Sequence, residues 1–564
     1  MKKTLLILFL LFSIFSYSSE TNGNVFLDNT SDHSGIIIKF NPVSPSAVYT
    51  EGPSDSNGAY NITVINGVYN VSYEKNGYQT YTITDQLISN DNTLTDVTLN
   101  SNTAVSVSGN VSGNWTNSNT YIVNGDITVP SGQTLNIEQG TEIKFDGYYS
   151  LIINGTLKAI GSENNIIKFT SIKTSPTNKD WKGIQINDIN TMSELKYCII
   201  EYGNDKNNDQ TGLIEIKGDV KIENSKIRHS SGVGVRISHN HSGDVTVKNS
   251  EIHDCTSGVY SSGSGQLIVD DSSIYDISEI GIRSWPDSEY TAITNNRISQ
   301  CLYGINSIGD ILINRNIIFD NSFYGLFVLD GKASIQNNTF LSNKNSIGIT
   351  ENDFYNPDAS INSNIFLNTV ELDIRSLGDF KPSLVAYNLF YNNSGIGNNL
   401  PVGVGSVITT NINGTDSDTY FNIFSPPNLI SFNPSDENFC KLDTNSDAIN
   451  AGDPNITNNY NSTVIDIGAK ESSVTLSINE FANSSFSVFP NPIISQVKIQ
   501  ANDSQLFNKI ILYNINGQVI KEHKLENLSN EYTLENLNHL NSGIYIMKIF
   551  NKLEKSKEIK LLKK

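Results

Sequence analysis

The sequence predicts an all-β protein whose middle is a solenoid of short parallel strands, and three observations support this. A phrase of two apolar positions around a central cysteine, serine or asparagine recurs nine times, at steps of 20 to 27 residues. A period in this range indicates a solenoid. Apolar residues alternate with polar ones inside the copies, which is the period of a strand with one buried face. No ten-residue stretch has the spacing of an amphipathic helix, so helical solenoids are excluded.

The nine copies run from residue 195 to residue 390 and predict one coil each of about 24 residues. They are Leu195-x-x-Cys198-x-Ile200, Ile222-x-x-Ser225-x-Ile227, Val247-x-x-Ser250-x-Ile252, Val269-x-x-Ser272-x-Ile274, Ile293-x-x-Asn296-x-Ile298, Ile313-x-x-Asn316-x-Ile318, Ile335-x-x-Asn338-x-Phe340, Ile361-x-x-Asn364-x-Phe366 and Val385-x-x-Asn388-x-Phe390. Because neighbouring coils lie roughly 4.8 Å apart, the central serine and asparagine side chains are expected to hydrogen-bond from coil to coil as a ladder.

A glycine followed by an apolar residue comes six to eight residues after the second apolar position. The pairs are Gly234-Val235, Gly258-Val259, Gly281-Ile282, Gly304-Ile305, Gly325-Leu326 and Gly348-Ile349. We interpret these glycines as the turn into the next strand, where glycine accepts backbone angles that other residues resist.

The N-terminal residues have the features of a secretory signal peptide, predicted over 1–19. Lys2 and Lys3 precede an apolar run from Leu5 to Phe15, and small residues follow it. This run is too short to span a membrane, and no later stretch approaches 18 apolar residues. We therefore expect an exported chain without a transmembrane segment after processing.

Residues 20–101 alternate like strands and carry Asp55-Ser56-Asn57-Gly58-Ala59-Tyr60, Gly67-Val68-Tyr69 and Lys75-Asn76-Gly77-Tyr78. These motifs resemble the carboxypeptidase regulatory-like domain. The resemblance implies a small β-sandwich that serves as an accessory module. Since the end of a solenoid exposes unpaired strand edges, a spacer and end cap is the expected role.

Residues 102–470 resemble the right-handed parallel β-helix superfamily. The segment from Trp115 to Thr170 is similar to the opening coils of secreted members, and Trp181-Lys182-Gly183-Ile184 to the coil that follows. Residues 448–454 and 466–469 are similar to a closing segment. The superfamily includes pectate-lyase-like polysaccharide lyases, glycosidases and surface proteins, so the resemblance implies the fold and leaves the chemistry open.

Residues 471–564 resemble the type A sorting domain of the type IX secretion system. The motifs are residues 486–492 (FSVFPNP), residues 510–519 (IILYNINGQV) and residues 540–546 (LNSGIYI), followed by a lysine-rich end. The resemblance implies export through the type IX machinery in a Bacteroidetes-type bacterium. The expected location is the outer cell surface or the extracellular space. The whole chain is thus expected to be a right-handed parallel β-helix flanked by two small β-sandwich domains.

The net charge of −20, with a pI near 4.8, argues against a nucleic-acid partner, because nucleic-acid binding needs a basic surface. A neutral glycan, a basic partner or divalent cations remain. The four cysteines do not predict disulfides. Cys255 and Cys301 are separated by the coil of Ile277, which puts them roughly 9.6 Å apart, beyond the ~7 Å limit for a bridge.

Candidate catalytic residues come from two columns of the repeat. His229, Asp254 and Asp276 lie two residues after the second apolar position, and Arg236 and Arg283 lie nine residues after it. A polysaccharide lyase needs a cation to neutralise a uronate carboxylate and a basic residue to take a proton, and an inverting hydrolase needs two carboxyl groups. Asp254 and Asp276 are also the candidate ligands of a calcium ion. No other cofactor is expected.

Two other interpretations compete with catalysis. Asp, His and Ser at the start of a turn commonly cap backbone groups, and no short lyase or polygalacturonase signature is present. Aromatic residues on consecutive coils, with Tyr275, Trp285 and Tyr303 as candidates, could instead stack on sugar rings. Two hypotheses remain, a non-catalytic protein that contacts glycans or other surfaces and a polysaccharide lyase or glycoside hydrolase. The non-catalytic protein is favoured because the residues give few positive signs of a catalytic site.

Overall fold

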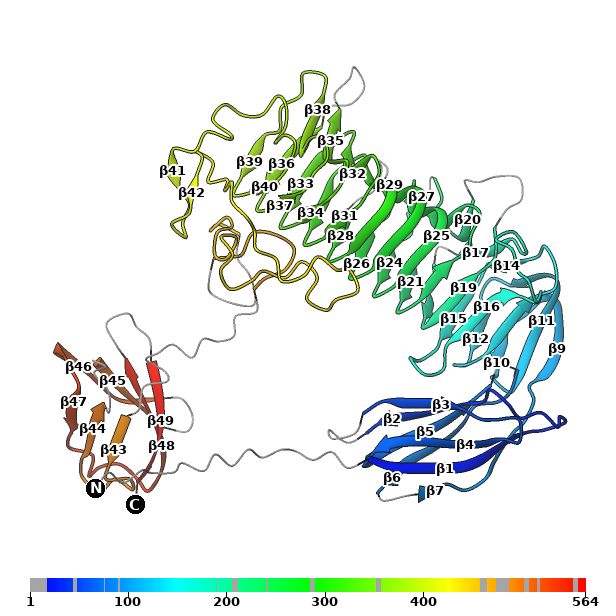
Figure 1. Cartoon of the computed structure of the whole chain (residues 1–564), viewed down its shortest axis with the longest axis horizontal. Coiled ribbons are helices and arrows are strands. Elements are labelled where there is room, and N and C mark those ends of the chain that lie inside the picture. The colour runs from blue at the N-terminus through cyan, green and yellow to red at the C-terminus, as the bar shows by residue number, and fades with distance from the viewer. Residues whose placement is uncertain are drawn as a thin grey trace, which may run out of the picture. The chain divides into compact units, whose positions relative to one another are not determined.

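The computed structural model is an all-β protein, and every regular element of the residues it describes is a strand (Figure 1). It describes residues 18–43, 48–75, 77–89, 92–188, 190–204, 211–239, 242–284, 290–350, 357–456, 464–472, 486–501, 507–514, 518–550 and 556–563. The predicted signal peptide lies almost wholly outside these residues. No helix in the described part of the chain is long and apolar enough to cross a membrane. The chain divides into two compact units, residues 1–471 and residues 472–564.

The N-terminal domain consists of two sheets that enclose one apolar core. One sheet has the order β4(Ala59–Ile65), β1(Ser18–Leu27), β7(Asn92–Thr93), with β8(Val97–Leu99) also pairing β1. The other has the order β3(Thr50–Pro53), β2(Ile37–Pro42), β5(Gly67–Glu74), β6(Tyr81–Ile88). Fully buried aromatic side chains of Phe40, Tyr69 and Tyr73 fill the space between them. Such a two-sheet domain is what the regulatory-like resemblance implies, and the resemblance itself stays a prediction.

The central coils begin at β9(Thr103–Asn110) and β11(Asn119–Val129), and each coil contributes a strand to three parallel faces. We call these face 1, face 2 and face 3. Face 1 contains β10(Gly113–Trp115), β12(Thr134–Ile137), β15(Thr156–Ile160), β18(Ser193–Lys196), β21(Val220–Glu223), β24(Val245–Lys248), β26(Leu267–Asp270), β28(Thr291–Thr294), β30(Ile311–Asn314), β33(Lys332–Gln336), β36(Asp358–Asn362) and β39(Leu384–Ala386).

Faces 2 and 3 share the long strands β25(Glu251–Ser261), β27(Ser273–Ser284) and β29(Arg297–Ser307), whose first halves lie in face 2 and second halves in face 3. Face 2 also contains β13(Glu142–Phe145), β16(Ile167–Ser171), β19(Cys198–Glu201), β22(Lys226–Arg228), β31(Ile317–Phe319), β34(Thr339–Leu341), β37(Ile365–Leu367) and β40(Leu389–Tyr391). Face 3 also contains β14(Ser150–Ile153), β17(Gly183–Ile186), β20(Gly212–Ile216), β23(Val233–Ile237), β32(Tyr324–Val328), β35(Asn345–Thr350) and β38(Ile374–Leu377).

The recurring phrase forms the core, as predicted. Its apolar residues are fully buried, and the rings of Phe340, Phe366 and Phe390 stack on consecutive coils at 5.1 and 4.9 Å. The asparagine ladder also forms. The Nδ2 group of Asn316 donates to Oδ1 of Asn338 at 3.0 Å, and Asn338 repeats this contact to Asn364. Ser225, Ser250 and Ser272 continue the column on earlier coils through backbone N–H to hydroxyl bonds. The cysteines are buried and unbridged, with Ile277 between Cys255 and Cys301.

The glycines of the repeat do not have the predicted role. Gly234, Gly258, Gly281, Gly304 and Gly325 lie inside strands of face 3, and none of them has a positive φ. A Cβ on Gly304 would lie 2.5 Å from the carbonyl oxygen of Gly325 on the next coil. Close approach of the coils, rather than a turn, therefore requires glycine there. Gly348 is out of this column, because Ser346 is the residue aligned with Gly325.

After β40 the chain caps the last coil and then returns along face 2. The ring of Phe424 stacks on Phe390, and Asn422 accepts from Asn388, which extends both columns. A small hairpin, β41(Thr409–Thr410) and β42(Asp416–Ser417), lies between these parts. The described part of residues 425–471, which we call the closing segment, then packs on the outer side of face 2. Asn362 binds Asp453, and the backbone N–H of Ala469 donates to the Thr339 hydroxyl.

The second unit is a separate two-sheet domain. One sheet has the order β43(Phe486–Phe489), β44(Val497–Ala501), β47(Glu531–Leu534), and the other β46(Val519–Ser529), β45(Phe507–Asn514), β48(Gly543–Phe550), β49(Ser556–Lys563). Phe507, Leu512, Met547 and Leu561 are fully buried between them.

Candidate functional site

The predicted catalytic column lies at the corner where face 2 turns into face 3. His229, Asp254, Asp276 and Gln300 stack on consecutive coils, and each has a left-handed φ of 50 to 53°. The left-handed backbone conformation is unfavourable for most residues with a side chain, and Asp, Asn and His are enriched among those that adopt it. The backbone of the corner thus gives a structural reason for the residue types that the sequence showed.

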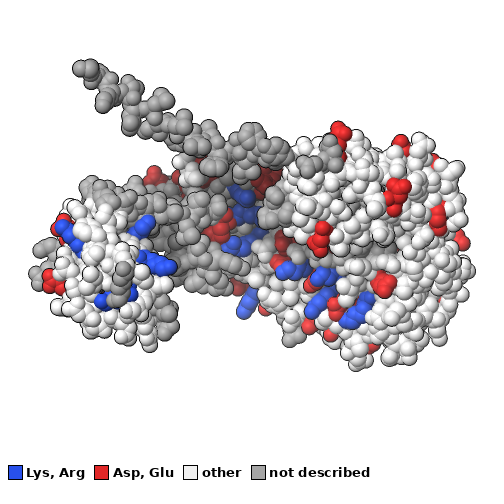
Figure 2. Space-filling model, turned by 90° about the horizontal axis from the view of Figure 1, so that it is seen from below, with Lys and Arg blue, Asp and Glu red and all other residues white. Residues whose placement is uncertain are grey.

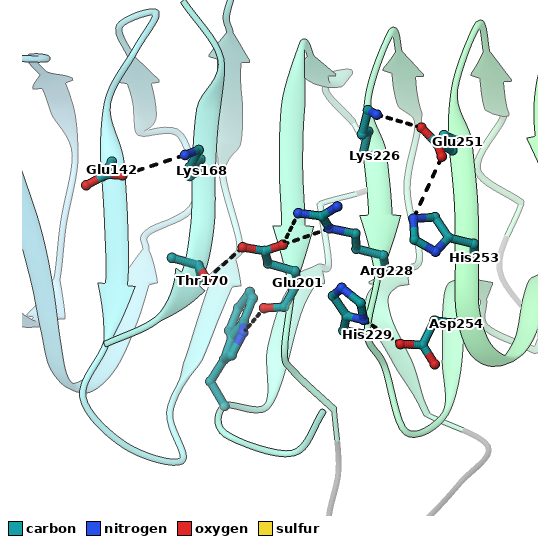
Figure 3. A network of polar contacts seen from close by, with 11 residues as sticks. Glu142, Lys168, Thr170, Glu201, Lys226, Arg228, His229, Glu251, His253 and Asp254 are labelled. Carbon is teal, nitrogen blue, oxygen red and sulfur yellow. Dashed lines mark hydrogen bonds and ion pairs between the residues drawn. The ribbon is translucent and has the colours of Figure 1, made fainter. Parts of the chain in front are cut away.

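His229 and Asp254 are in direct contact at this corner. The His229 Nδ1 atom hydrogen-bonds the Asp254 carboxylate, and its ring stacks on Tyr202 at 4.8 Å (Figure 3). The Asp254 side chain is about half exposed, whereas that of His229 is more buried. The pair is therefore an oriented imidazole beside an accessible carboxylate, an arrangement that general acid–base chemistry can use.

A polar hollow of about 530 Å³ opens beside the pair. Asp254, Asp276 and Gln300 line it, together with Lys179 from a loop and with Ser230, Ser231 and Thr256. Two of the five predicted catalytic residues thus line one hollow, and His229 contacts it through Asp254. Neither Arg236 nor Arg283 is among its lining residues.

The outer side of face 2 carries a charged network next to this corner, and the sequence pattern did not predict it. Arg228 binds Glu201 at 2.8 Å, and Lys226 binds Glu251 at 2.8 Å (Figure 3). The Tyr275 hydroxyl also donates to Glu251, and the Tyr275 ring stacks on His253 at 4.9 Å. These residues directly precede or follow the second apolar residue of each phrase. Strand alternation therefore predicts that they point outward, but only the register between coils shows which of them are neighbours.

Burial and charge set the ionisation of this network. Desolvation lowers the pKa of His253, and the nearby positive Arg228 lowers it further, against the opposing effect of Glu251. Burial raises the pKa of Tyr275, and its hydrogen bond to Glu251 adds to that rise. For Glu251, burial would raise the pKa, but the hydrogen bonds from Lys226 and Tyr275 outweigh it and lower the pKa overall. His253 is therefore neutral at pH 7.

Arg236 and Arg283 lie on the outer side of face 3, where they flank one aromatic ring. The guanidinium of Arg283 lies 5.1 Å from the centre of the Tyr260 ring, and that of Arg236 lies 5.8 Å from it. Consecutive coils thus alternate Arg, Tyr and Arg. These arginines belong to a different face from the charged network, and this arrangement does not support their predicted partnership with the aspartates.

Further along face 3, four aromatic side chains from two consecutive coils form a cluster. Tyr303 stacks with Tyr324 at 5.9 Å and lies 5.7 Å from Phe327, and Phe323 contacts both tyrosines. Tyr303, Phe323 and Phe327 are half-buried. The next coil provides Gly348 beneath the rings, where a Cβ would lie 2.4 Å from Tyr324 and 2.5 Å from Phe327. The predicted sugar-binding residue Tyr303 is therefore part of a built aromatic surface.

The other two predicted aromatic residues have different surroundings. Tyr275 belongs to the network of face 2, where its hydroxyl is bound to Glu251. Trp285 lies outside the described residues.

The outer side of face 2 changes from polar to apolar along the coils. Its outward column runs Glu201, Arg228, His253, Tyr275 and Ser299, then continues as Phe319, Leu341 and Leu367. The closing segment covers this apolar half, with Phe439 against Phe319 at 5.1 Å. Arg297 donates to the carbonyl of Pro434, and Arg315 binds Glu471 at 2.7 Å. The polar half of face 2 has no such cover in the part of the chain that is described.

Neither metal-ligating side chains nor the distribution of charge indicates a further site among the described residues. The described residues contain no group of three or more His, Cys, Asp or Glu side chains placed to hold a metal ion. The calcium role of Asp254 and Asp276 stays a prediction. On the face drawn in Figure 2, acidic and basic side chains are intermixed, so the negative net charge does not gather into one patch there.

Comparisons with known proteins agree with this architecture. Residues 208–366 match the family described as the right handed beta helix region, and residues 106–231 match the pectate-lyase like beta helix domain. Residues 487–564 match the secretion system C-terminal sorting domain. The chain is a right-handed parallel β-helix followed by a type IX sorting domain. The sorting domain indicates delivery to the outer cell surface or the extracellular space.

Among solved structures, pectate lyase Pel9A matches over 63% of this chain and 88% of its own, with 15% identity and a TM-score of 0.36. A type II cohesin–X-dockerin complex from Acetivibrio cellulolyticus matches over 15% of this chain and 58% of its own, with 20% identity and a TM-score of 0.13. The chain therefore spans less than two thirds of that second structure. Neither likeness is close enough to bear on activity. No curated protein matches the chain.

Proposed function

We propose that this exported β-helix protein is a non-catalytic glycan-contacting scaffold, and that face 3 is its contact surface. The aromatic cluster of Tyr303, Phe323 and Phe327 carries the proposal. These rings are half-buried and held in place by their neighbours, so they lose little side-chain entropy when they bind. Rigid, partly exposed aromatic rings suit stacking against the apolar faces of sugar rings.

The arginine and tyrosine column supports the same surface. Tyr260 lies between two guanidinium groups, and all three side chains point outward from consecutive coils. Guanidinium groups donate hydrogen bonds to sugar hydroxyl groups, and the coil spacing repeats the contact along the chain axis. Several weak contacts in a row raise the total affinity for a polymer.

Affinity electrophoresis of the mature protein in gels that contain neutral or acidic polysaccharides tests the proposal. We expect Tyr303→Ala and Phe327→Ala each to weaken retardation by one polysaccharide about 2- to 10-fold, the effect of one aromatic stacking contact. Tyr391→Ala is the matched control, because Tyr391 is an exposed tyrosine of face 2. Unchanged retardation in both face 3 variants would contradict the proposal.

A polysaccharide lyase or glycoside hydrolase is the second candidate function, and the corner hollow favours it. Asp254 and Asp276 line this hollow with Lys179, and His229 is oriented by Asp254. A lyase would use a basic group to remove a proton, and a hydrolase would use the two carboxyl groups. The purified protein would then release unsaturated uronides or new reducing ends, and Asp254→Ala would abolish the release. Activity retained in Asp254→Ala would exclude this site.

A further inference from the structure

Gly348 occupies an outward position of face 3 at which the neighbouring coils carry large side chains. The outward column consists of Arg236, Tyr260, Arg283, Asn306 and Phe327, then Gly348, and then Arg375. Gly348 is nevertheless buried, although it has no side chain of its own. Side chains of other residues must therefore cover its backbone.

The atoms that a side chain at position 348 would meet distinguish this glycine from those of the repeat. The three nearest are Cε1 and Cδ1 of Tyr324, at 2.4 and 2.7 Å from the added Cβ, and Cδ2 of Phe327, at 2.5 Å. A Cβ on Gly304 would instead meet a backbone carbonyl oxygen. Gly348 also has no positive φ, so its backbone conformation does not itself require glycine. Two aromatic rings, rather than the backbone, require glycine at this position.

The Tyr324 and Phe327 rings thus occupy the space that a side chain of the next coil would fill. They lie along the sheet over Gly348, with their centres 4.8 Å apart and their planes 38° apart. Tyr303 stacks on Tyr324 within 17°. A ring that lies along a sheet turns one face towards the backbone and the other outward. The face of an aromatic ring carries negative charge density and attracts the C–H groups of a sugar.

The cations beside the cluster are already neutralised. The Lys344 ammonium group lies 5.6 Å from the centre of the Phe323 ring. Burial raises the pKa of Tyr324, and the nearby Arg375 opposes that rise. Glu371 binds both cations, at 3.5 Å from Lys344 and 2.8 Å from Arg375. A uronate carboxylate would have to compete with Glu371 for them and would be repelled by its charge, whereas a neutral sugar would not.

We infer that Gly348 is a positioning residue that holds the Tyr324 and Phe327 rings against the sheet for stacking on sugar rings, and that this surface prefers neutral polysaccharides to uronate polymers. The inference rests on the proposed glycan contact of face 3. It adds the class of sugar, the residue that orients the rings, and Glu371 as the group that discriminates against acidic polymers.

Affinity electrophoresis of the full mature chain in gels that contain xylan, mannan, polygalacturonate or alginate tests the positioning role. Gly348→Ala should weaken retardation by a neutral polysaccharide about 2- to 10-fold, because the rings must tilt away from the added methyl group. Its near-ultraviolet circular dichroism should change while the far-ultraviolet spectrum stays the same. Gly147→Ala is the matched control, since its Cβ would also meet only ring atoms, those of Tyr149, outside the cluster. It should bind as the wild type does.

Equal retardation of Gly348→Ala and the wild type, by a polysaccharide that retards the wild type, would overturn the positioning role and leave the proposed function standing. A wild type that none of the four polymers retards would overturn both.

Glu371→Gln tests the preference for neutral sugars, and it does so even if Gly348→Ala does not fold. The Glu371 side chain is 40% exposed, so the substitution should leave the fold intact. It releases Lys344 and Arg375 and should raise the ratio of uronate to neutral retardation several-fold at low salt, with less effect at high salt. A wild type that uronate polymers retard more strongly than neutral ones would overturn the preference, and so would an unchanged ratio in Glu371→Gln.

Discussion

The asparagine ladder should contribute measurably to stability, and Asn338 is the position that tests this best. It is fully buried, and its Oδ1 atom accepts from the Asn316 backbone N–H at 2.9 Å. Its Nδ2 group donates to the carbonyl oxygens of Ile313 and Gln336, both at 2.9 Å. Asn338→Ala leaves at least the Asn316 N–H and the Ile313 carbonyl without these partners. Each stranded buried group costs about 1–3 kcal/mol, so the expected loss is about 2–6 kcal/mol.

An earlier coil of the chain suggests a milder substitution at position 338. On earlier coils Ser250 occupies the same column, where its hydroxyl accepts from the Ser225 N–H and donates to the carbonyl of Lys248. Asn338→Ser can reproduce both contacts, but it loses the Nδ2 bonds to the Ile313 carbonyl and to Oδ1 of Asn364. The Asn364 oxygen still accepts from the backbone N–H of residue 338, so only the Ile313 carbonyl loses this partner, at about 1–3 kcal/mol. Asn136→Ala is the control, because Asn136 makes a similar contact between coils on the exposed outer side of face 1. It should change stability by no more than about 0.5 kcal/mol.

Scanning calorimetry of the full chain measures these losses as shifts of the β-helix transition. Several domains are present, so comparing transition midpoints among variants is more secure than one free energy for the whole chain. The expected order of midpoints is wild type and Asn136→Ala, then Asn338→Ser, then Asn338→Ala. Equal midpoints for Asn338→Ala and Asn338→Ser would refute the reasoning, because the loss would then reflect altered packing rather than stranded polar groups.

Three further outcomes are expected. Gly304→Ala should destabilise the β-helix by about 1–3 kcal/mol or more, seen in calorimetry as a lower transition midpoint, because its Cβ would lie 2.5 Å from the Gly325 carbonyl oxygen. His253 has a lowered pKa in the folded state, so the unfolded state binds more protons below pH 6.5 and stability should fall as the pH drops from 6.5 towards that lowered pKa. His253→Gln should reduce this pH dependence of the midpoint, and an unchanged dependence would refute the assignment. Deleting residues 472–564 should leave the protein in the periplasm when cells are fractionated, and normal surface delivery would refute the sorting role.

The fold was predictable from the sequence because the repeat records which residues are buried. Apolar and asparagine positions can be counted along the chain, and both columns form as the count predicts. The last position of the asparagine ladder, Asn422, was not predicted, because it follows Asn388 after 34 residues, a longer step than any in the repeat. The glycines were misinterpreted for a different reason. A glycine needed for close approach and one needed for a positive φ look the same in a sequence, and only the register between coils separates them.

The candidate site was less predictable, because the register between adjacent strands decides which outward residues are neighbours, and the repeat does not show that register. Glu201 and Arg228 are 27 residues apart, and they pair only because adjacent strands bring them together at the same height. The grouping of His229 with Asp254 was anticipated from the column, but the separation of Arg236 onto another face was not. The side on which each residue lies depends on the left-handed corner residue between the two strands, and a sequence pattern does not show that corner.

The outer faces of the β-helix differ in what a large ligand would have to displace in order to bind. Face 1 carries ion pairs between coils, such as Lys158 with Glu194 and Lys248 with Asp270, whose charges already satisfy one another. The second half of face 2 is occupied by the closing segment, and its first half consists of acids and bases that are also paired. A neutral polymer that bound these paired faces would have to compete with their ion pairs and displace their water. The aromatic rings of face 3 have no ion pair to break, and the release of water from their partly exposed apolar surface favours binding. This difference, rather than the fold or the net charge, is the physical reason for placing the contact surface on face 3.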